Sequence, residues 1–174
     1  MVHDSFLQID GVKGESTDSA HKDWIEILSY AHAITQPASA TAGSAGGGTI
    51  GRCKHDDFVI TKYVDLASPK LYELCCSGKH ISKVVIELMR ASGDAPVKYM
   101  AIEMDQVVIS KVNPVSAAKN NGSDGKASED LPTESISFNY GVIKWTYTQQ
   151  KRADGSKGGN VTGGWSLVEG KTAA

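Results

Sequence analysis

The chain has 174 residues, of which 40% are apolar and 22% charged, with a formal net charge of −2. These values are typical of a folded globular protein, and the near-balance of charge argues against a dedicated nucleic-acid-binding protein. The length suits one domain spanning residues 1–174, which buries enough surface to fold without a disulfide or a metal.

Neither a secretory signal nor a membrane span is expected. Residues 1–4 lack a basic start, no apolar run follows them, and the chain has no stretch of about 18 apolar residues. The cysteines Cys53, Cys75 and Cys76 make an odd count, so reduced thiols in the cytoplasm are the simplest interpretation. If the protein leaves the cell, it is expected to leave by another route than general secretion.

Strand-like patterns dominate the chain. Alternating apolar residues or aromatic and β-branched runs occupy 7–9, 24–30, 58–64, 81–89, 99–112, 136–140, 143–147 and 162–168. The run at 99–112 is expected to bend near Asp105 and Gln106. Gly141, where the apolar parity changes, is expected in a bulge or tight bend. The pattern predicts a mainly β sandwich or barrel.

One helix is predicted at 68–77. Ser68 and Pro69 suit the N-cap and first helical position, apolar residues follow at helical spacing, and Gly78 is a fitting stop. Cys75 and Cys76 lie late in this helix, so we expect both to be packed, inert thiols.

Two long segments, 36–57 and 114–132, are predicted as loops. The first contains Pro37 and a Gly-rich run, and the second is polar. Both exceed the usual connection length, so each is expected to be mobile or to be ordered by a partner.

Motifs for catalysis or cofactor binding are weak. Gly46, Gly48 and Gly51 match the spacing of a dinucleotide fingerprint, but an Ala/Ser/Thr loop precedes them instead of a strand, which favours a flexible loop. Cys53 and His55 lack the second pair that a zinc site needs. We therefore predict no enzyme, no metal and no cofactor, although a cysteine-histidine hydrolase remains open because such partners meet only in the fold.

The remaining aromatic and acidic residues allow more than one interpretation. Trp24, Trp145 and Trp165, together with Tyr140 and Tyr147, could line a ligand cup in a barrel, fill a core, or lie in a subunit interface. Glu87, like Glu26 and Glu103, is expected on a solvated sheet face.

Three blocks of residues then stand in order along most of the chain. They occupy 9–26, 58–79 and 137–165, and their distinctive runs are Ile9-Asp10-Gly11-Val12-Lys13-Gly14-Glu15, Lys62-Tyr63-Val64-Asp65, Cys75-Cys76-Ser77-Gly78-Lys79 and Gly163-Gly164-Trp165. In these blocks the chain resembles the Hcp family, the hemolysin-coregulated proteins of type VI secretion.

The resemblance implies a β-barrel of two antiparallel sheets with one short flanking helix. It implies hexameric rings that stack into a tube within a contractile sheath, capped by a valine-glycine repeat spike protein and carrying small effector toxins. It implies export by the type VI machine, with no nucleic acid and no membrane as partners. The alternative is a monomeric β-barrel that binds a small ligand or single-stranded nucleic acid.

Within this framework the first long loop is the candidate site. A tube gives the segment 36–57 a role in reaching the next ring, and its end mixes basic and acidic groups suited to polar contacts. The candidate ring-stacking residues are Gly46, Gly47, Gly48, Arg52, Lys54 and His55.

Overall fold

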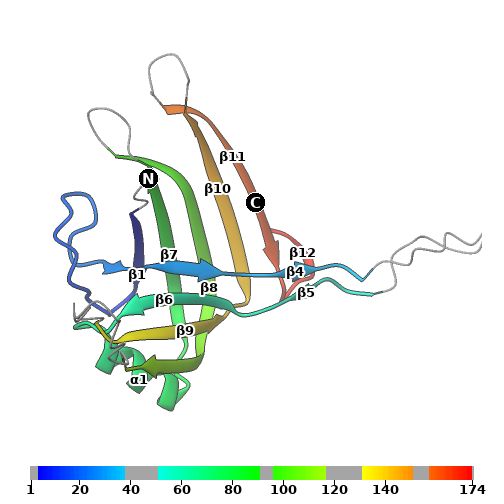
Figure 1. Cartoon of the computed structure of the whole chain (residues 1–174). Coiled ribbons are helices and arrows are strands. Elements are labelled where there is room, and N and C mark those ends of the chain that lie inside the picture. Colours follow the sequence, from blue (N-terminus) through cyan, green and yellow to red (C-terminus); the bar gives the residue numbers. More distant parts are fainter. Residues whose placement is uncertain (1–3, 38–50, 91–95, 117–130, 151–156, 174) are drawn as a thin grey trace, which may run out of the picture.

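The computed structural model describes residues 4–37, 51–90, 96–116, 131–150 and 157–173. In this part the chain forms mainly antiparallel strands and one helix (Figure 1). In chain order the elements are β1 (Ser5–Ile9), β2 (Ile25–Glu26), β3 (Ser29–Ala31), β4 (Ile34–Thr35), β5 (Lys54–His55), β6 (Phe58–Tyr63), α1 (Ser68–Ser77), β7 (Ile81–Arg90), β8 (Val97–Val115), β9 (Thr133–Asn139), β10 (Val142–Gln150), β11 (Lys157–Ser166) and β12 (Lys171–Thr172).

Two antiparallel sheets share the long strand β8. The first half of β8 lies between β7 and β10, and its second half pairs with β9, which in turn pairs with β6. The strand changes sheet at Gln106, which has a positive φ of 56°. The predicted bend near Asp105 and Gln106 is therefore confirmed.

Gly141 marks the return crossing between the sheets, from β9 to β10. Its N–H donates to the carbonyl of Asp105 at 3.1 Å. A Cβ at this position would lie 2.7 Å from the side-chain oxygen of Gln106 and 3.1 Å from a methyl group of Val168, so these side chains would have to shift to admit it. Gly141 thus lies at the predicted bend, against side chains rather than against backbone atoms.

The prediction of a closed barrel is not confirmed. Among the described residues, one path of paired strands runs from β12 through β11, β10, β8, β7 and β1 to β2, and a branch from β8 runs through β9 and β6 to β3. No strand pairing joins the ends of these paths in the described part of the chain. The predicted strand at 24–30 is split into β2 and β3 because Ile27 donates to Ser5 in the first sheet and Leu28 to Thr61 in the second.

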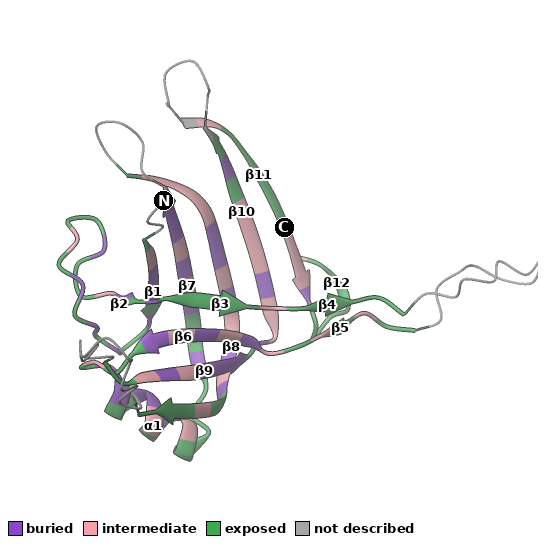
Figure 2. Cartoon of the chain, viewed as in Figure 1, coloured by how far each residue is buried: buried purple, intermediate pink, exposed green. Residues whose placement is uncertain are grey.

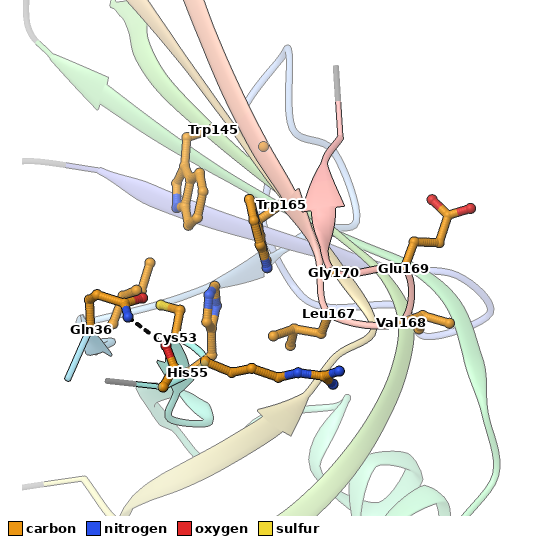
Figure 3. A pocket seen from close by; sticks show the side chains of 13 residues that line it. Gln36, Cys53, His55, Trp145, Trp165, Leu167, Val168, Glu169 and Gly170 are labelled. Atoms are coloured by element: carbon orange, nitrogen blue, oxygen red, sulfur yellow. Dashed lines mark hydrogen bonds between the residues drawn. The ribbon is translucent and has the colours of Figure 1, made fainter. Parts of the chain in front are cut away.

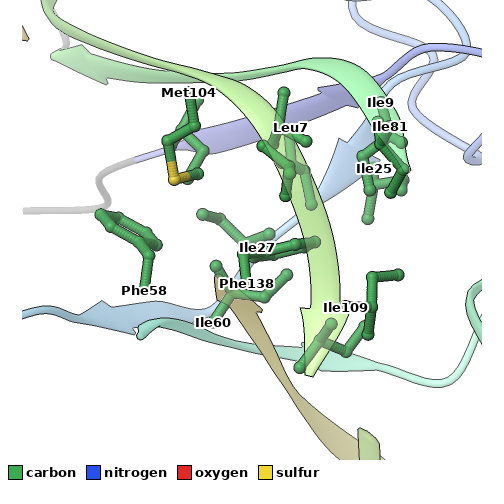
Figure 4. Packing of buried hydrophobic residues seen from close by; sticks show 14 of the residues in the cluster. Leu7, Ile9, Ile25, Ile27, Phe58, Ile60, Ile81, Met104, Ile109 and Phe138 are labelled. Carbon is green, nitrogen blue, oxygen red and sulfur yellow. The ribbon is translucent and has the colours of Figure 1, made fainter. Parts of the chain in front are cut away.

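The hydrophobic core fills the space between the two sheets (Figure 4). Leu7 and Met104 come from the first sheet, and Phe58, Ile60 and Phe138 from the second, and each is at most 1% exposed. The predicted alternation of apolar residues is thus the alternation of buried positions in these strands, as Figure 2 shows along β6 and β9.

Helix α1 has the predicted bounds but begins differently. Its N-cap position is Ala67, without a side-chain cap, and the hydroxyl of Ser68 instead accepts from the backbone N–H of Asp65 at 3.0 Å. Gly78 ends the helix in the left-handed conformation with φ 60°, as expected. The assignment of Ser68 as N-cap was therefore wrong, because its side chain is used by neighbours outside the helix.

The two helix cysteines differ in environment. Cys75 is partly buried against the core, whereas Cys76 is exposed. Successive positions on a helix point about 100° apart, so Cys76 turns away from the stripe that buries Leu71 and Leu74. The prediction that both thiols are packed is wrong for Cys76.

A buried ionic network attaches α1 to the second sheet. Lys62 and Glu134 have fully buried side chains, and the Lys62 Nζ lies 2.9 Å from Glu134 Oε1 and 2.6 Å from Asp65 Oδ1. Ser68 and Tyr72 of α1 donate hydrogen bonds to the same glutamate. Burial alone would raise the pKa of Glu134, but the hydrogen bonds from Tyr72, Lys62 and Ser68 outweigh it and lower that pKa. Burial and Glu134 together raise the pKa of Tyr72 to about 12.

A second ionic cluster holds the segment between β1 and β2 against β7. The ring of His21 is 2% exposed and stacks on Phe6, with its nitrogens 2.8 Å from Asp18 Oδ1 and 3.0 Å from Glu87 Oε2. Lys98 also donates to Glu87, at 2.7 Å. Glu87 is therefore a bound ion-pair partner rather than the freely solvated group that was expected.

This cluster predicts a loss of stability in acid. Burial raises the pKa of Glu87, but the hydrogen bonds from Lys98 and His21 lower it overall. A carboxyl whose pKa is lower in the folded state stabilises that state above its unfolded pKa of about 4.3, and the stabilisation is lost as the pH falls. Urea unfolding should show a smaller pH slope below about pH 4.5 in Glu87→Gln than in the parent. The exposed Glu26→Gln variant is the control, and an equal slope in both variants would contradict the assignment.

Candidate functional site

The candidate site contains a two-stranded extension of the fold, which we call the arm; its described residues are 34–37 and 51–55. They include β4 and β5, which pair Ile34 with His55 and Thr35 with Lys54. It continues the pairing of β3 with β6 and projects from the body of the molecule beside β12 (Figure 1). The predicted loop at 36–57 is therefore partly a β-ribbon.

The root of the arm is fixed by two histidines and one phenol. His32 Nε2 lies 2.7 Å from the hydroxyl oxygen of Tyr140, and His55 Nδ1 lies 2.8 Å from the same atom. His32 precedes β4 and His55 ends β5, so one side chain of the body binds both legs of the arm. Phe58 and Trp145 surround His32, with ring centroids at 5.2 Å and 6.4 Å.

The electrostatics of this root disfavour charge. Burial lowers the pKa of His32, and the neighbouring His55 lowers it further, while Asp56 opposes the shift. Burial also lowers the pKa of His55. The pKa of Tyr140 is raised by burial and then by the charge of Asp57. All three groups are therefore held in their neutral forms near neutral pH.

A hollow of about 770 Å³ lies beside the root, between the arm and the turn that links β11 to β12. Figure 3 shows Trp145 and Trp165 pointing into it toward His55, with Leu167 on the facing side. Both tryptophans are half-buried. Trp145 also packs against the hydrophobic core, so it fits the core alternative while it lines the hollow.

The structure separates the predicted site residues into three groups. Gly46, Gly47 and Gly48 lie outside the described residues. Arg52 and Lys54 are exposed on the arm, and Lys54 Nζ lies 3.3 Å from Asp56 Oδ1. His55 is turned inward, with its Nδ1 2.8 Å from the Tyr140 hydroxyl oxygen, and its ring also lines the hollow.

Sequence reasoning missed His32, and it placed Tyr140 only among the aromatic residues of a ligand cup, a core or a subunit interface. One signal was available for Tyr140, since a tyrosine on an inward strand face needs a partner for its hydroxyl. Its exposed fraction is 4%. Nothing near His32 in the sequence points to residue 140, which lies 108 positions away.

The described residues hold no group of three or more His, Cys, Asp or Glu side chains arranged to bind a metal ion. The same part of the chain has no helix that is both long and apolar enough to cross a membrane.

Comparisons with known proteins place this fold among the type VI secretion proteins. Residues 6–147 match the family model described as type VI secretion system effector, Hcp. Protein hcp1 of Pseudomonas aeruginosa is 34% identical over 168 residues, with 96% of each chain covered. The major exported protein of the same organism is 26% identical over 136 residues, with 77% of this chain and 74% of that protein covered.

A solved structure supports the same placement. A type six secretion system protein superposes with a TM-score of 0.86 at 30% identity, covering 99% of this chain and 100% of its own. The family model and the superposed structure together identify this chain as a type VI secretion system protein. The chain belongs to the Hcp family.

Proposed function

We propose that this chain is the structural subunit of a type VI secretion inner tube. In this proposal it forms hexameric rings that stack, are exported, and carry effectors in their channel. The observation that carries the proposal is membership of the Hcp family over residues 6–147. The name of the major exported protein supports export of this chain by the same system.

The arm supports the proposal that rings stack through this segment. It projects from the body, and its exposed Arg52 and Lys54 offer polar groups to a neighbouring surface. Gly46, Gly47 and Gly48 belong to the same proposed contact. His55 serves it indirectly, because it anchors the arm on Tyr140.

The further partners follow from this role and are proposals of the same kind. They are other copies of the chain, a valine-glycine repeat spike protein, a contractile sheath and small effector toxins. The chain then acts as a single domain without catalysis, before firing in the cytoplasm and afterwards outside the cell. Neither nucleic acid nor membrane takes part.

Native mass spectrometry and electron microscopy of the purified protein test the ring. We expect a hexamer and annular particles with a central channel. A protein that sediments only as a monomer at high micromolar concentration would refute the proposal.

Shortening the arm separates stacking from ring closure. Deleting residues 38–48 should leave the hexamer intact but shorten tubes under crowding and reduce secretion, because a loop deletion changes closure entropy only slightly. Deleting 119–129 removes the same number of residues from the second long segment and serves as the matched control. Equal tube lengths in the parent and the 38–48 deletion would exclude a stacking role for the arm, and loss of the ring would assign the arm to the interface within the ring.

A second candidate function rests on the hollow beside Trp145 and Trp165. Its volume of about 770 Å³ is in the range of small-molecule pockets, which favours the monomeric ligand-binding alternative over one for nucleic acid. A chain that stays monomeric, and whose tryptophan fluorescence saturates with a small apolar ligand, would support this alternative.

A further inference from the structure

We propose that His32, His55 and Tyr140 form an acid-released latch that holds the arm on the body of the protein. The latch is a property of the folded chain itself, and its consequence for stacking rests on the proposed function. In its geometry, the imidazole of His32, just before β4, and that of His55, at the end of β5, both contact the single buried hydroxyl of Tyr140.

Hydrogen counting explains why the closed latch needs neutral rings. A phenol carries one proton and can accept further hydrogen bonds, and a neutral imidazole has one donor and one acceptor nitrogen. In the closed state the Tyr140 hydroxyl therefore donates to one ring and accepts from the N–H of the other. Protonation of the accepting ring turns its nitrogen into a second donor and leaves the phenol proton without that acceptor.

Charge repulsion adds to this loss. The ring centroids of His32 and His55 are 6.2 Å apart, so two imidazolium groups would face each other at a partly buried site. Phe58 of β6 and Trp145 of β10, which contact His32, supply aromatic faces but no counter-charge.

The nearby carboxylates are already engaged. Asp56 lies 3.3 Å from the ammonium of Lys54, and Asp57 accepts hydrogen bonds from Ser110 and Asn139. The neighbouring thiol is that of Cys53 on the arm.

Two side chains of opposite charge line the hollow beside the latch. Arg52 lines it from the arm and Glu169 from the turn between β11 and β12. In Figure 3 the Glu169 side chain points away from His55. Acid therefore adds positive charge to the latch, where Asp56 favours the charged form of His32 but burial and His55 outweigh it.

The direction of the pH dependence follows from linkage. Burial lowers the pKa of both histidines while the arm is closed, and an open arm would return them to about 6.5. The open state then binds more protons, so the closed arm is fully favoured above about pH 6.5 and loses stability as the pH falls below it. In a tube, the same release would loosen the contact between rings in acid.

Hydrogen exchange read by mass spectrometry on the full-length protein tests the latch. The arm offers defined reporters, since β4 and β5 exchange backbone hydrogen bonds and the N–H of Asp56 donates to Ala33 at 3.0 Å. After correction for intrinsic rates, protection of peptides covering 33–37 and 51–56 should fall about tenfold between pH 7.5 and 5.0. Peptides from β7 and β8 should keep their protection. Unchanged arm protection would overturn the latch.

Matched variants assign the effect to the histidines. The double variant His32→Gln/His55→Gln keeps side chains that can bond the phenol but do not titrate, so its arm should lose the pH dependence. His80→Gln alters an exposed histidine outside the latch and should behave like the parent. A double variant that still releases its arm in acid would place the switch elsewhere and refute the proposal.

A second measurement does not depend on the folding of the double variant. Nuclear magnetic resonance titration of the parent, assigned through the single variants, should give His32 and His55 apparent pKa values below the ordinary histidine value of about 6.5. Values at or above about 6.5 would overturn the latch. Exchange of the arm is read on each chain whether or not it assembles. If the chain is a monomer whose arm is still released in acid, the tube is refuted and the latch stands. If the chain forms stacked hexamers whose arm protection does not change with pH, the latch is refuted and the tube stands.

Discussion

Replacing Lys62 with methionine is expected to lower the free energy of unfolding by about 3–5 kcal/mol. The substitution removes the cation that lies 2.9 Å from the fully buried carboxylate of Glu134 and leaves that charge without its counter-ion. Removing one partner of a buried ion pair costs far more than the pair contributes as a whole, because the remaining charge stays desolvated. Urea unfolding followed by circular dichroism measures the change.

Two further variants show whether the unpaired charge is the cause. Lys62→Met combined with Glu134→Gln removes both charges and keeps an acceptor for Ser68 and Tyr72, so it should recover part of the lost stability. Lys70→Met breaks the exposed pair with Glu73 and should cost less than about 1 kcal/mol. Equal losses in Lys62→Met and Lys70→Met would show that burial of the network contributes nothing.

Gly14→Ala is the second substitution with a large expected effect, about 3 kcal/mol of destabilisation from overpacking. A Cβ at residue 14 would lie 2.3 Å from the carbonyl oxygen of Trp24 and 2.7 Å from the Cα of Ile25. These are backbone atoms, and the N–H of Gly14 is bound to the carbonyl of Asp23 at 2.8 Å, so neither segment can easily move away.

Gly163 provides the matched control for this steric argument. It also lies in an extended segment, but no atom comes within 4 Å of an added Cβ. Gly163→Ala should therefore change the free energy of unfolding by less than about 1 kcal/mol in either direction. Thermal and urea unfolding of both variants decide the matter, and a loss in Gly163→Ala as large as that in Gly14→Ala would reject the close backbone approach as the cause.

Local patterns predicted most elements because each pattern reports its own segment. The alternation at residues 58–64 became β6, and the bend at Gln106 and the helix stop at Gly78 lie where backbone conformation requires them. The split of 24–30 into two strands was not predictable, since it depends on which distant carbonyls accept from Ile27 and Leu28. Closure of the sheets could not be predicted for the same reason, since it depends on pairing between strands that lie far apart in the sequence.

Periodicity and ordered motifs are properties of neighbouring residues, so most strands, the helix and the resemblance to the Hcp family could be predicted from the sequence. The buried pair of Lys62 and Glu134, and the meeting of His32 and His55 at Tyr140, depend on how distant segments pack and could not. The bonds of Tyr140 span 108 and 85 positions of the chain. Burial sets whether such groups are charged and what they do, and burial is fixed only when distant strands pack together.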